Sequence, residues 1–419
     1  MVDTIKRAWN LPDLRSRLLY TFMLLIIYRF GSAIVVPYIN LDVLAAYIEA
    51  NSVLGLLNVI TGNNFKNFSV FAMGIQPYIN ASIIMNLLSM AIPALERLNK
   101  EGDAGQKKIA KYTKYVAAVL AIIQALGMTL GFDSFLTVDR WYVVVLITTI
   151  ICAGTSFLMW LGEQITDKGI GNGISMIIFI SIISGLPAGI ANIYNGILVG
   201  SYPFYIVIVM LLFGLISIIG VVAVQEGTRK IPVSYAKRVV GRKMYGGRNT
   251  HLPMKVNQSG VIPIIFAQTL VLFPSQIAAF FPNNRVLASI SDALVMTKPW
   301  TMVMYVVLIV AFTFFYTMVT FNPEEVAENL QQYGGFVPGI RSGKPTVTYL
   351  TRILNRLTLS GSLFLAMIAI LPTIASMIIG TEDLQFTGTS LLIVVGVALE
   401  TVEALEQHMI MRNYKGFLK

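Results

Sequence analysis

Residues 53–93 read VLGLLNVITGNNFKNFSVFAMGIQPYINASIIMNLLSMAIP, and this stretch decides the fold. Its first apolar part, 53–60, is too short to cross a bilayer, which takes about 20 residues, and a polar break at 61–67 follows. The second apolar part, 68–93, is long enough to span, yet helix-breaking or polar residues interrupt it: Gly74, Gln76, Pro77, Asn80, Asn86. Broken, polar-containing helices occur at membrane depth where they line a cavity or pack within protein. The stretch therefore predicts a half-helix followed by a spanning helix at a functional centre.

The composition of the whole chain predicts a polytopic membrane protein. Of its 419 residues, 56% are hydrophobic and 12% are charged, and the mean hydropathy is +0.72. Soluble proteins carry about twice that fraction of charged residues. A single Cys (Cys152) and two His (His251, His408) exclude a disulfide framework and argue against a His/Cys metal site, so we expect no metal and no cofactor. The basic N-terminal region lacks an Ala-x-Ala pattern after its apolar run, so we expect no cleavable signal peptide.

Apolar runs along the chain predict an all-α fold with ten transmembrane helices. We expect them at about 18–38, 68–92, 112–132, 141–161, 172–193, 204–224, 260–281, 300–321, 357–380 and 388–408. Residues 1–17 are expected to form a short amphipathic segment on the membrane surface.

Basic residues predict the orientation, because Lys and Arg accumulate on the cytoplasmic side of membrane proteins. With the N-terminus in the cytoplasm, the ten spans place 26 of the 31 Lys and Arg residues on that side. The other five lie on the opposite side: Arg29, Lys66, Arg140, Arg285, Lys298. Both termini are then cytoplasmic. The strong bias also supports an even number of spans.

Two cytoplasmic loops are long for connections in a compact bundle, which favours binding surfaces. The loop 225–258 is strongly basic, and the loop 322–356 begins acidic and ends basic. Gly and Pro between 334 and 345 predict a turn with Arg341 near its tip. The alternative is that these charges only set the topology of the chain.

No pattern in the sequence predicts catalysis. A phosphate-binding Gly-x-x-x-x-Gly-Lys-Ser/Thr loop is missing, and the Gly-rich run 169–173 follows a membrane span and not a strand. We expect that the protein is not an enzyme, and that energy for any uphill transport comes from a partner or a gradient.

An ion-coupled secondary transporter remains an alternative, because such proteins place ionisable residues inside spans. Only Glu400 is expected deep in a span, whereas four other ionisable residues lie near span ends: Arg29, Glu163, Glu403, Glu406. A purely structural membrane scaffold is a third possibility.

Two further sets of residues have both structural and functional interpretations. Polar residues in the second and seventh spans either join helices by hydrogen bonds or form a weakly polar seam that can part: Asn80, Ser82, Asn86, Gln268, Thr269. Isoleucines four residues apart share one helix face, which is typical of packing or lipid contact: Ile75 with Ile79, and Ile174 with Ile178.

Essentially the whole chain resembles the SecY family, the pore-forming subunits of the bacterial protein-conducting channel. Six stretches carry the resemblance: GIQPYINASII (74–84), LMWLGEQIT (158–166) with GIGNGIS (169–175), THLPMKVN (250–257), GVIP (260–263), FVPGIR (336–341) and GTSLLI (388–393).

The resemblance implies two halves, 1–195 and 196–419, related as an inverted repeat around a central hourglass pore. It implies a constriction ring formed by six isoleucines: Ile75, Ile79, Ile174, Ile178, Ile265, Ile393. It implies a plug helix at about 54–65, with Leu54, Leu57, Ile60, Asn63 and Asn64 as plug residues. It also implies a lateral gate to lipid that contains Asn80, Asn86, Gln268 and Thr269.

The implied function is translocation of unfolded secretory polypeptides across the bacterial plasma membrane, with sideways release of transmembrane segments into lipid. The implied partners are SecE-like and SecG-like small subunits, the motor ATPase SecA, the ribosome, and a preprotein or signal peptide. The basic loops suit docking of such partners through six residues: Arg238, Arg242, Lys243, Arg248, Arg341, Lys344.

One geometric requirement follows from the ring. In ordinary spans Ile75 and Ile174 would lie about 30 Å apart, at opposite membrane faces. They share a ring only if both helices begin deep in the membrane. The hypothesis therefore predicts that the side chains of Ile79 and Ile178 lie near each other.

Overall fold

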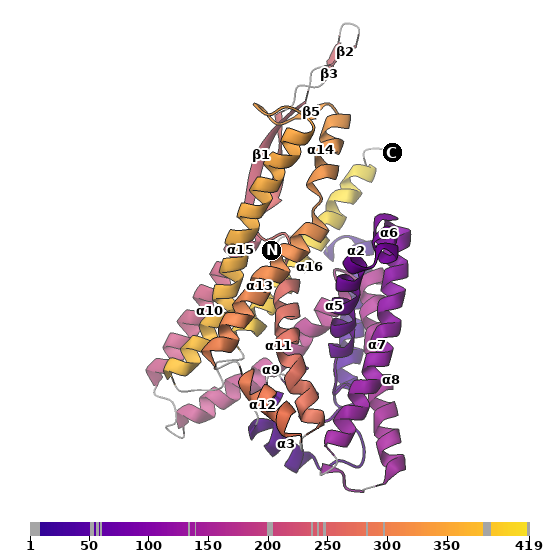
Figure 1. Ribbon diagram of the computed structural model, residues 1–419, viewed down its shortest axis with the longest axis vertical. Helices are drawn as coiled ribbons and strands as arrows, with labels where there is room; N and C mark the ends of the chain where they lie inside the picture. Colours follow the sequence, from indigo (N-terminus) through magenta and orange to yellow (C-terminus); the bar gives the residue numbers. More distant parts are fainter. Residues whose placement is uncertain are drawn as a thin grey trace.

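The structure is a computed structural model, and it describes residues 9–50, 54–55, 58, 61–132, 135–138, 140–198, 204–235, 238–240, 243–245, 249–281, 284–295, 298–379 and 387–416. Predicted residues Leu57, Ile60, Arg242 and Arg248 lie outside the described residues. The molecule is an elongated bundle of helices, and a small β-sheet projects from one end (Figure 1).

In the described chain, a helix lies at each of the ten predicted spans. These are α2 (Pro12–Gly31), α5 (Gln76–Ala91), α7 (Asp103–Gly131), α8 (Trp141–Lys168), α9 (Gly173–Leu198), α10 (Phe204–Gln225), α11 (Ile262–Phe280), α13 (Pro299–Thr320), α15 (Lys344–Ile379) and α16 (Thr387–Gly416). Helix α2 starts at Pro12, inside the stretch 1–17 that we expected to form a separate segment on the membrane surface, so residues 12–17 are continuous with the first of these helices. By length and composition alone, 4 helices of the described chain can cross a membrane, or up to 5 if a bent pair counts as one span.

The second span starts later than predicted, because α5 begins only at Gln76. Residues 61–75 form a series of turns, which we call the turn segment. Hydrogen bonds hold it beside the end of α2: Val36 N donates to Phe68 O at 3.0 Å, and Val70 N donates to Ile34 O at 2.9 Å. At its other end, α5 meets α6 (Pro93–Lys100) at a bend of 104°. Pro77 and Pro93 stand in the first turns of α5 and α6, where a missing N–H costs nothing.

The two long loops fold together into a small sheet of order β4-β1-β5. Strand β1 (Thr228–Tyr235) pairs antiparallel with β4 (Asn249–Lys255), and β5 (Gly335–Phe336) pairs with the end of β1. Apolar residues from the sheet, from α14 (Pro323–Gln332) and from α15 form one cluster: Ile231, Met254, Ala327, Val337, Leu350, Leu354. A separate hairpin joins β2 (Arg238–Val240) and β3 (Lys243–Tyr245). The mostly helical membrane fold is confirmed, whereas these strands were not predicted.

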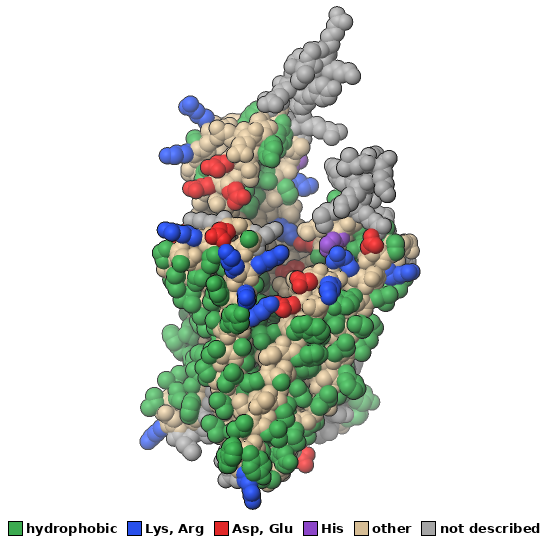
Figure 2. All heavy atoms as spheres, turned by 90° about the vertical axis from the view of Figure 1, so that its right-hand side faces the viewer, with side chains coloured by type: hydrophobic (Ala, Val, Ile, Leu, Met, Phe, Trp, Pro, Cys, Tyr) green, Lys and Arg blue, Asp and Glu red, His purple; other side chains and the backbone are tan. Residues whose placement is uncertain are grey.

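Two short helices lie near the end of the bundle opposite the sheet, α3 (Leu41–Ala50) and α12 (Arg285–Ala293) (Figure 1). Figure 2 shows a broad hydrophobic surface over the drawn face of the bundle, with charged side chains gathered mainly toward the end with the sheet. Large exposed apolar residues also occur on α2, α7, α8, α10 and α13, as expected for helices that face lipid.

Candidate functional site

All six isoleucines of the implied ring lie in one hydrophobic cluster. Ile75, Ile79, Ile178 and Ile393 are buried members, and Ile174 and Ile265 are partly buried and pack against them. They come from the starts of α5 and α9, from the first turn of α11 and from α16. The cluster therefore joins helices from both parts of the chain.

The late start of α5 brings Ile79 and Ile178 together. Ile79 lies in the first turn of α5, and Ile178 lies near the start of α9. Both side chains line one cavity of about 10 Å³, together with Ile75 and Ile177. The ring hypothesis requires this proximity. A void of this size holds about one water molecule at most.

A chain of buried hydrogen bonds lies beside this cavity and ties the turn segment to α2 and α9. Asn64 Nδ2 donates to the hydroxyl oxygen of Tyr28 at 2.9 Å, and that oxygen lies 2.6 Å from Ser181 Oγ. Ser181 Oγ donates its own hydrogen to Ile177 O at 2.7 Å. Since the Ser181 hydrogen is used there, the Tyr28 hydroxyl donates to Ser181. Asn64 was predicted as a plug residue, but Tyr28 and Ser181 were missed; their hydroxyls inside apolar runs were the available signal.

The turn segment also fits closely against α9 at Gly62. A Cβ atom on Gly62 would lie 2.6 Å from the carbonyl oxygen of Ser181, and the φ of Gly62 is +68°. Only glycine tolerates both conditions. Asn58 and Asn63 brace the start of the segment, with Asn58 Nδ2 donating to Asn63 Oδ1 at 2.9 Å. Of the predicted plug residues, Leu54 is also buried.

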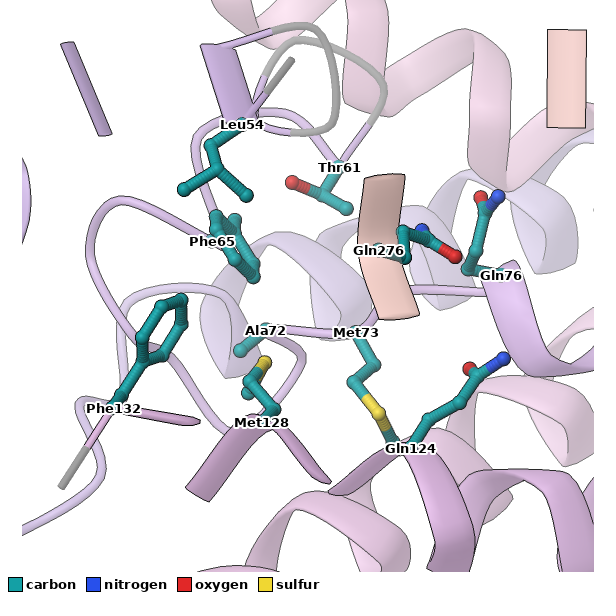
Figure 3. Close-up of a pocket in the computed structure, with 10 residues that line it drawn as sticks. All are labelled: Leu54, Thr61, Phe65, Ala72, Met73, Gln76, Gln124, Met128, Phe132 and Gln276. Atoms are coloured by element: carbon teal, nitrogen blue, oxygen red, sulfur yellow. The ribbon is translucent and has the colours of Figure 1, made fainter. Parts of the chain in front are cut away.

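A second cavity of about 40 Å³ lies between the turn segment, α7 and α11 (Figure 3). Leu54, Phe65, Met128 and other apolar side chains form one side of it. The side chains of three glutamines lie at the other side, and they come from α5, α7 and α11: Gln76, Gln124, Gln276.

Three of the four predicted gate residues are buried in helices that contact each other, Asn80 in α5 and Gln268 and Thr269 in α11. Asn80, Gln268 and Thr269 are each about 5% exposed or less, whereas Asn86 is half-buried. In the described structure, Asn80 Nδ2 is buried and has no hydrogen-bond partner. Hydrogen bonds from Asn80 Nδ2 therefore do not hold these helices together. Leaving this buried donor without a partner costs stability.

Glu400, on which the transporter alternative rested, caps another helix. Its carboxylate accepts a hydrogen bond from the backbone N–H of Val261, the residue just before α11. A Cβ atom on Gly260 would lie 2.5 Å from Glu400 Oε1, so glycine makes room for the carboxylate. Acidic groups stabilise helix N-termini, where backbone N–H groups lack partners. One helical turn further along α16, Glu403 Oε2 lies 2.5 Å from Lys255 Nζ at the end of β4.

The tip of the second loop presents Arg341 to solvent. Arg341 and Lys344 are exposed, and Thr346 Oγ1 donates to the Arg341 carbonyl oxygen at 2.9 Å, which closes the turn. Gly339 and Gly343, with φ of +82° and +92°, provide the left-handed backbone on either side. Buried Val337 anchors the turn in the cluster beneath the sheet. Arg238 and Lys243 lie in the β2–β3 hairpin, away from Arg341 in the sequence.

No group of three or more His, Cys, Asp or Glu residues in the described parts of the chain is arranged to hold a metal ion.

Comparison with known proteins identifies the family. The SecY family model matches residues 69–402. The chain is 48% identical to the protein translocase subunit SecY of Halalkalibacterium halodurans and 44% identical to that of Bacillus subtilis, and each match covers 100% of both chains.

Solved structures with low sequence identity share the fold. The structure of a protein conducting channel matches with a TM-score of 0.67 at 19% identity, covering 94% of this chain and 93% of that chain. The Sec61 chain from a canine ribosome-channel complex matches with a TM-score of 0.63 at 17% identity, covering 94% and 93%. The ten-span arrangement of the present chain fits this fold.

The full-length identity to translocase subunits decides between the open alternatives, since neither an ion-coupled transporter nor a scaffold is needed to account for the chain. The protein is a multi-pass membrane protein of the bacterial type, a protein-conducting channel subunit and not an enzyme. The chain belongs to the SecY family of protein translocase subunits.

Proposed function

We propose that unfolded secretory polypeptides cross the bacterial plasma membrane between two halves of this chain, 1–195 and 196–419, through a ring formed by the six isoleucines. The observation that carries this proposal is the position of Ile79 and Ile178 on one small cavity, at the starts of two helices. A ring of branched apolar side chains excludes water and ions when closed. It yields to a passing chain without preference for sequence, because it offers no charge to select one.

Residues 54–65, which include the first part of the turn segment, act as the plug in this proposal. The hydrogen bonds from Asn64 through Tyr28 to Ser181 hold the plug against α9 in the closed channel. A solved SecY protein that shares this fold has a plug domain that stabilises the closed state of its translocation channel and maintains a membrane seal. The same role for 54–65 explains why a polar stretch is buried beside the isoleucine cluster.

Lateral release of transmembrane segments takes place where α11 separates from α5 and α7 when the gate opens. The packing of Asn80, Gln268 and Thr269 gives this seam a weakly polar character, so a segment there can exchange between channel and lipid. A Leu, Ile or Phe gains a few tenths of a kcal/mol in the membrane, whereas a central Arg or Lys costs about 3 kcal/mol. The seam thereby sorts segments by their apolar content.

The sheet end of the molecule faces the cytoplasm in this proposal, together with both chain termini. The sheet joins the two basic loops into one platform that presents Arg341 and Lys344. Such a surface suits the motor ATPase SecA and the phosphates of ribosomal RNA. A related channel occurs in a ribosome complex. SecE-like and SecG-like subunits cover part of the exposed apolar surface.

Disulfide crosslinking to a stalled preprotein tests the proposal. Single cysteines replace Ile79 or Ile178 in a Cys152→Ser background, and a cysteine in the preprotein reports contact during SecA-driven transport. We expect crosslinks at both positions. Ile123→Cys is the matched control, because Ile123 is an isoleucine on α7 that is 58% exposed on the surface of the bundle. Equal crosslinking at Ile123 and at the two ring positions would contradict the proposed path.

A further inference from the structure

Helix α12 has three distinct sides. Leu287 and Ser291 are its least exposed positions. Together with Leu294, which directly follows the helix, their spacing of four and three residues places them on the side that packs against the protein. The next side carries Val286, Ile290 and Ala293, all exposed. The remaining side is polar and exposed, with Arg285, Ser289 and Asp292.

The apolar side is the unusual one. Val286 is 67% exposed and Ile290 is 41% exposed, and no residue of α12 is fully buried. The helix is nevertheless well defined at its start, because Asn284 Oδ1 accepts from Val286 N at 3.0 Å and from Leu287 N at 3.4 Å. Because these apolar residues are exposed and aligned on one side of a capped helix, that side requires contact with an apolar environment.

Chain connectivity places α12 at the membrane boundary. It follows α11 after residues 281–284 and precedes α13 after residues 294–298, and four or five residues reach about 18 Å at most. It also packs directly against α11, at the end opposite the sheet (Figure 1). Phe281 and Trp300, 56% and 61% exposed, flank it at the ends of the two spans. Tryptophan is enriched at the level of lipid headgroups.

We propose that α12 lies in the headgroup region of the leaflet opposite the sheet, with Val286 and Ile290 inserted in lipid and Arg285, Ser289 and Asp292 in water. The three sides of the helix match the three surroundings that meet at this boundary: protein, lipid and water. Interfacial helices of this kind bury their apolar face about 5–10 Å deep. The insertion fixes the depth of the adjoining end of α11, and it does not depend on what passes through the protein.

Fluorescence quenching in vesicles tests this placement. The full-length protein with Cys152→Ser receives one cysteine at a time, as Val286→Cys, Ile290→Cys, Ser289→Cys or Asp292→Cys, and each is labelled with bimane. The protein is reconstituted into vesicles of phosphatidylethanolamine and phosphatidylglycerol. Nitroxide-labelled lipids then quench from the membrane, and iodide quenches from water.

We expect nitroxide lipids to quench the labels at 286 and 290 severalfold more than those at 289 and 292, and iodide to show the reverse order. Iodide quenching that is equal at all four positions would place α12 in water and overturn the proposal. Labels at 286 and 290 that are shielded from both quenchers would show that another protein surface covers this face, which also overturns it. All four positions are exposed, so the substitutions leave the core intact.

Discussion

The hydroxyl oxygen of Tyr28 in α2 lies 2.6 Å from Ser181 Oγ in α9, and the same hydroxyl accepts a hydrogen bond from Asn64. Two membrane helices and the turn segment therefore share one buried group. Hydrogen bonds in series polarise one another, so such a chain is stronger than its separate parts. The relationship connects the position of the proposed plug to the packing of two helices behind it.

Removing the Tyr28 hydroxyl is expected to loosen the plug. Tyr28→Phe leaves Asn64 Nδ2 buried without its acceptor, at a cost of about 1–3 kcal/mol. Because that cost is borne by the closed state, we expect faster ion flux through the resting channel. Dye or ion efflux from proteoliposomes measures it.

Tyr20→Phe is the matched control for this variant. Tyr20 lies in the same helix and also loses one hydroxyl hydrogen bond, to Gln164 Oε1 at 3.2 Å, but it does not contact the turn segment through that bond. Equal leak from the two variants would mean that general loosening of α2, and not the link to Asn64, controls the seal.

The capping role of Glu400 predicts different outcomes for two substitutions. Glu400→Gln keeps an oxygen that accepts from Val261 N–H, so we expect preprotein transport close to that of the unmodified protein. Glu400→Leu removes the acceptor and should lower the free energy of unfolding by about 0.5–2 kcal/mol. Thermal unfolding of the purified protein and transport into vesicles measure the two effects. Loss of transport in the Gln variant with unchanged stability would favour a direct role for the carboxyl charge.

Gly154 in α8 is expected to tolerate no side chain. A Cβ atom there would lie 2.0 Å from the carbonyl oxygen of Val70, so α8 meets the turn segment backbone to backbone. Gly154→Ala should destabilise the protein by about 1–3 kcal/mol, because the segment must shift.

Gly185 in α9 provides a control of opposite sign. Among the described residues, no atom lies within 4 Å of a Cβ atom added at Gly185. Since alanine restricts the unfolded chain and favours helix, Gly185→Ala should stabilise the protein by about 0.5–1 kcal/mol. If Gly154→Ala and Gly185→Ala shift the thermal unfolding temperature in the same direction, the close approach at Gly154 is disproved.

Arg341→Glu is expected to slow SecA-driven transport while the protein still folds. The side chain is exposed, so its loss does not disturb the core. A charge-assisted hydrogen bond to a partner contributes about 1.5–3 kcal/mol, so its loss should lower the affinity for SecA by about tenfold or more. Arg356→Glu makes the same charge change at another exposed residue, on α15, and should retain transport. Similar losses in both variants would indicate a general charge effect and not a specific contact of Arg341.

The sequence by itself determined the number and approximate positions of the membrane helices. Length and apolarity decide this, because a bilayer accepts only segments whose backbone groups are satisfied internally. Local chemistry also predicted the Gly-rich turn around Arg341, since left-handed backbone favours glycine. The six isoleucines were named by resemblance and not by their spacing, which equally suited lipid contact.

Only the tertiary structure decided how these helices combine. The start of α5 at Gln76 depends on the turn segment packing against α2, α8 and α9, and it brings Ile79 to Ile178. The link from Tyr28 to Ser181 joins residues 153 positions apart, and Glu400 caps a helix that begins far earlier in the chain. The sheet likewise pairs strands from two separate loops. Such contacts depend on the relative positions of distant segments, and no local pattern of apolar and polar residues encodes those positions.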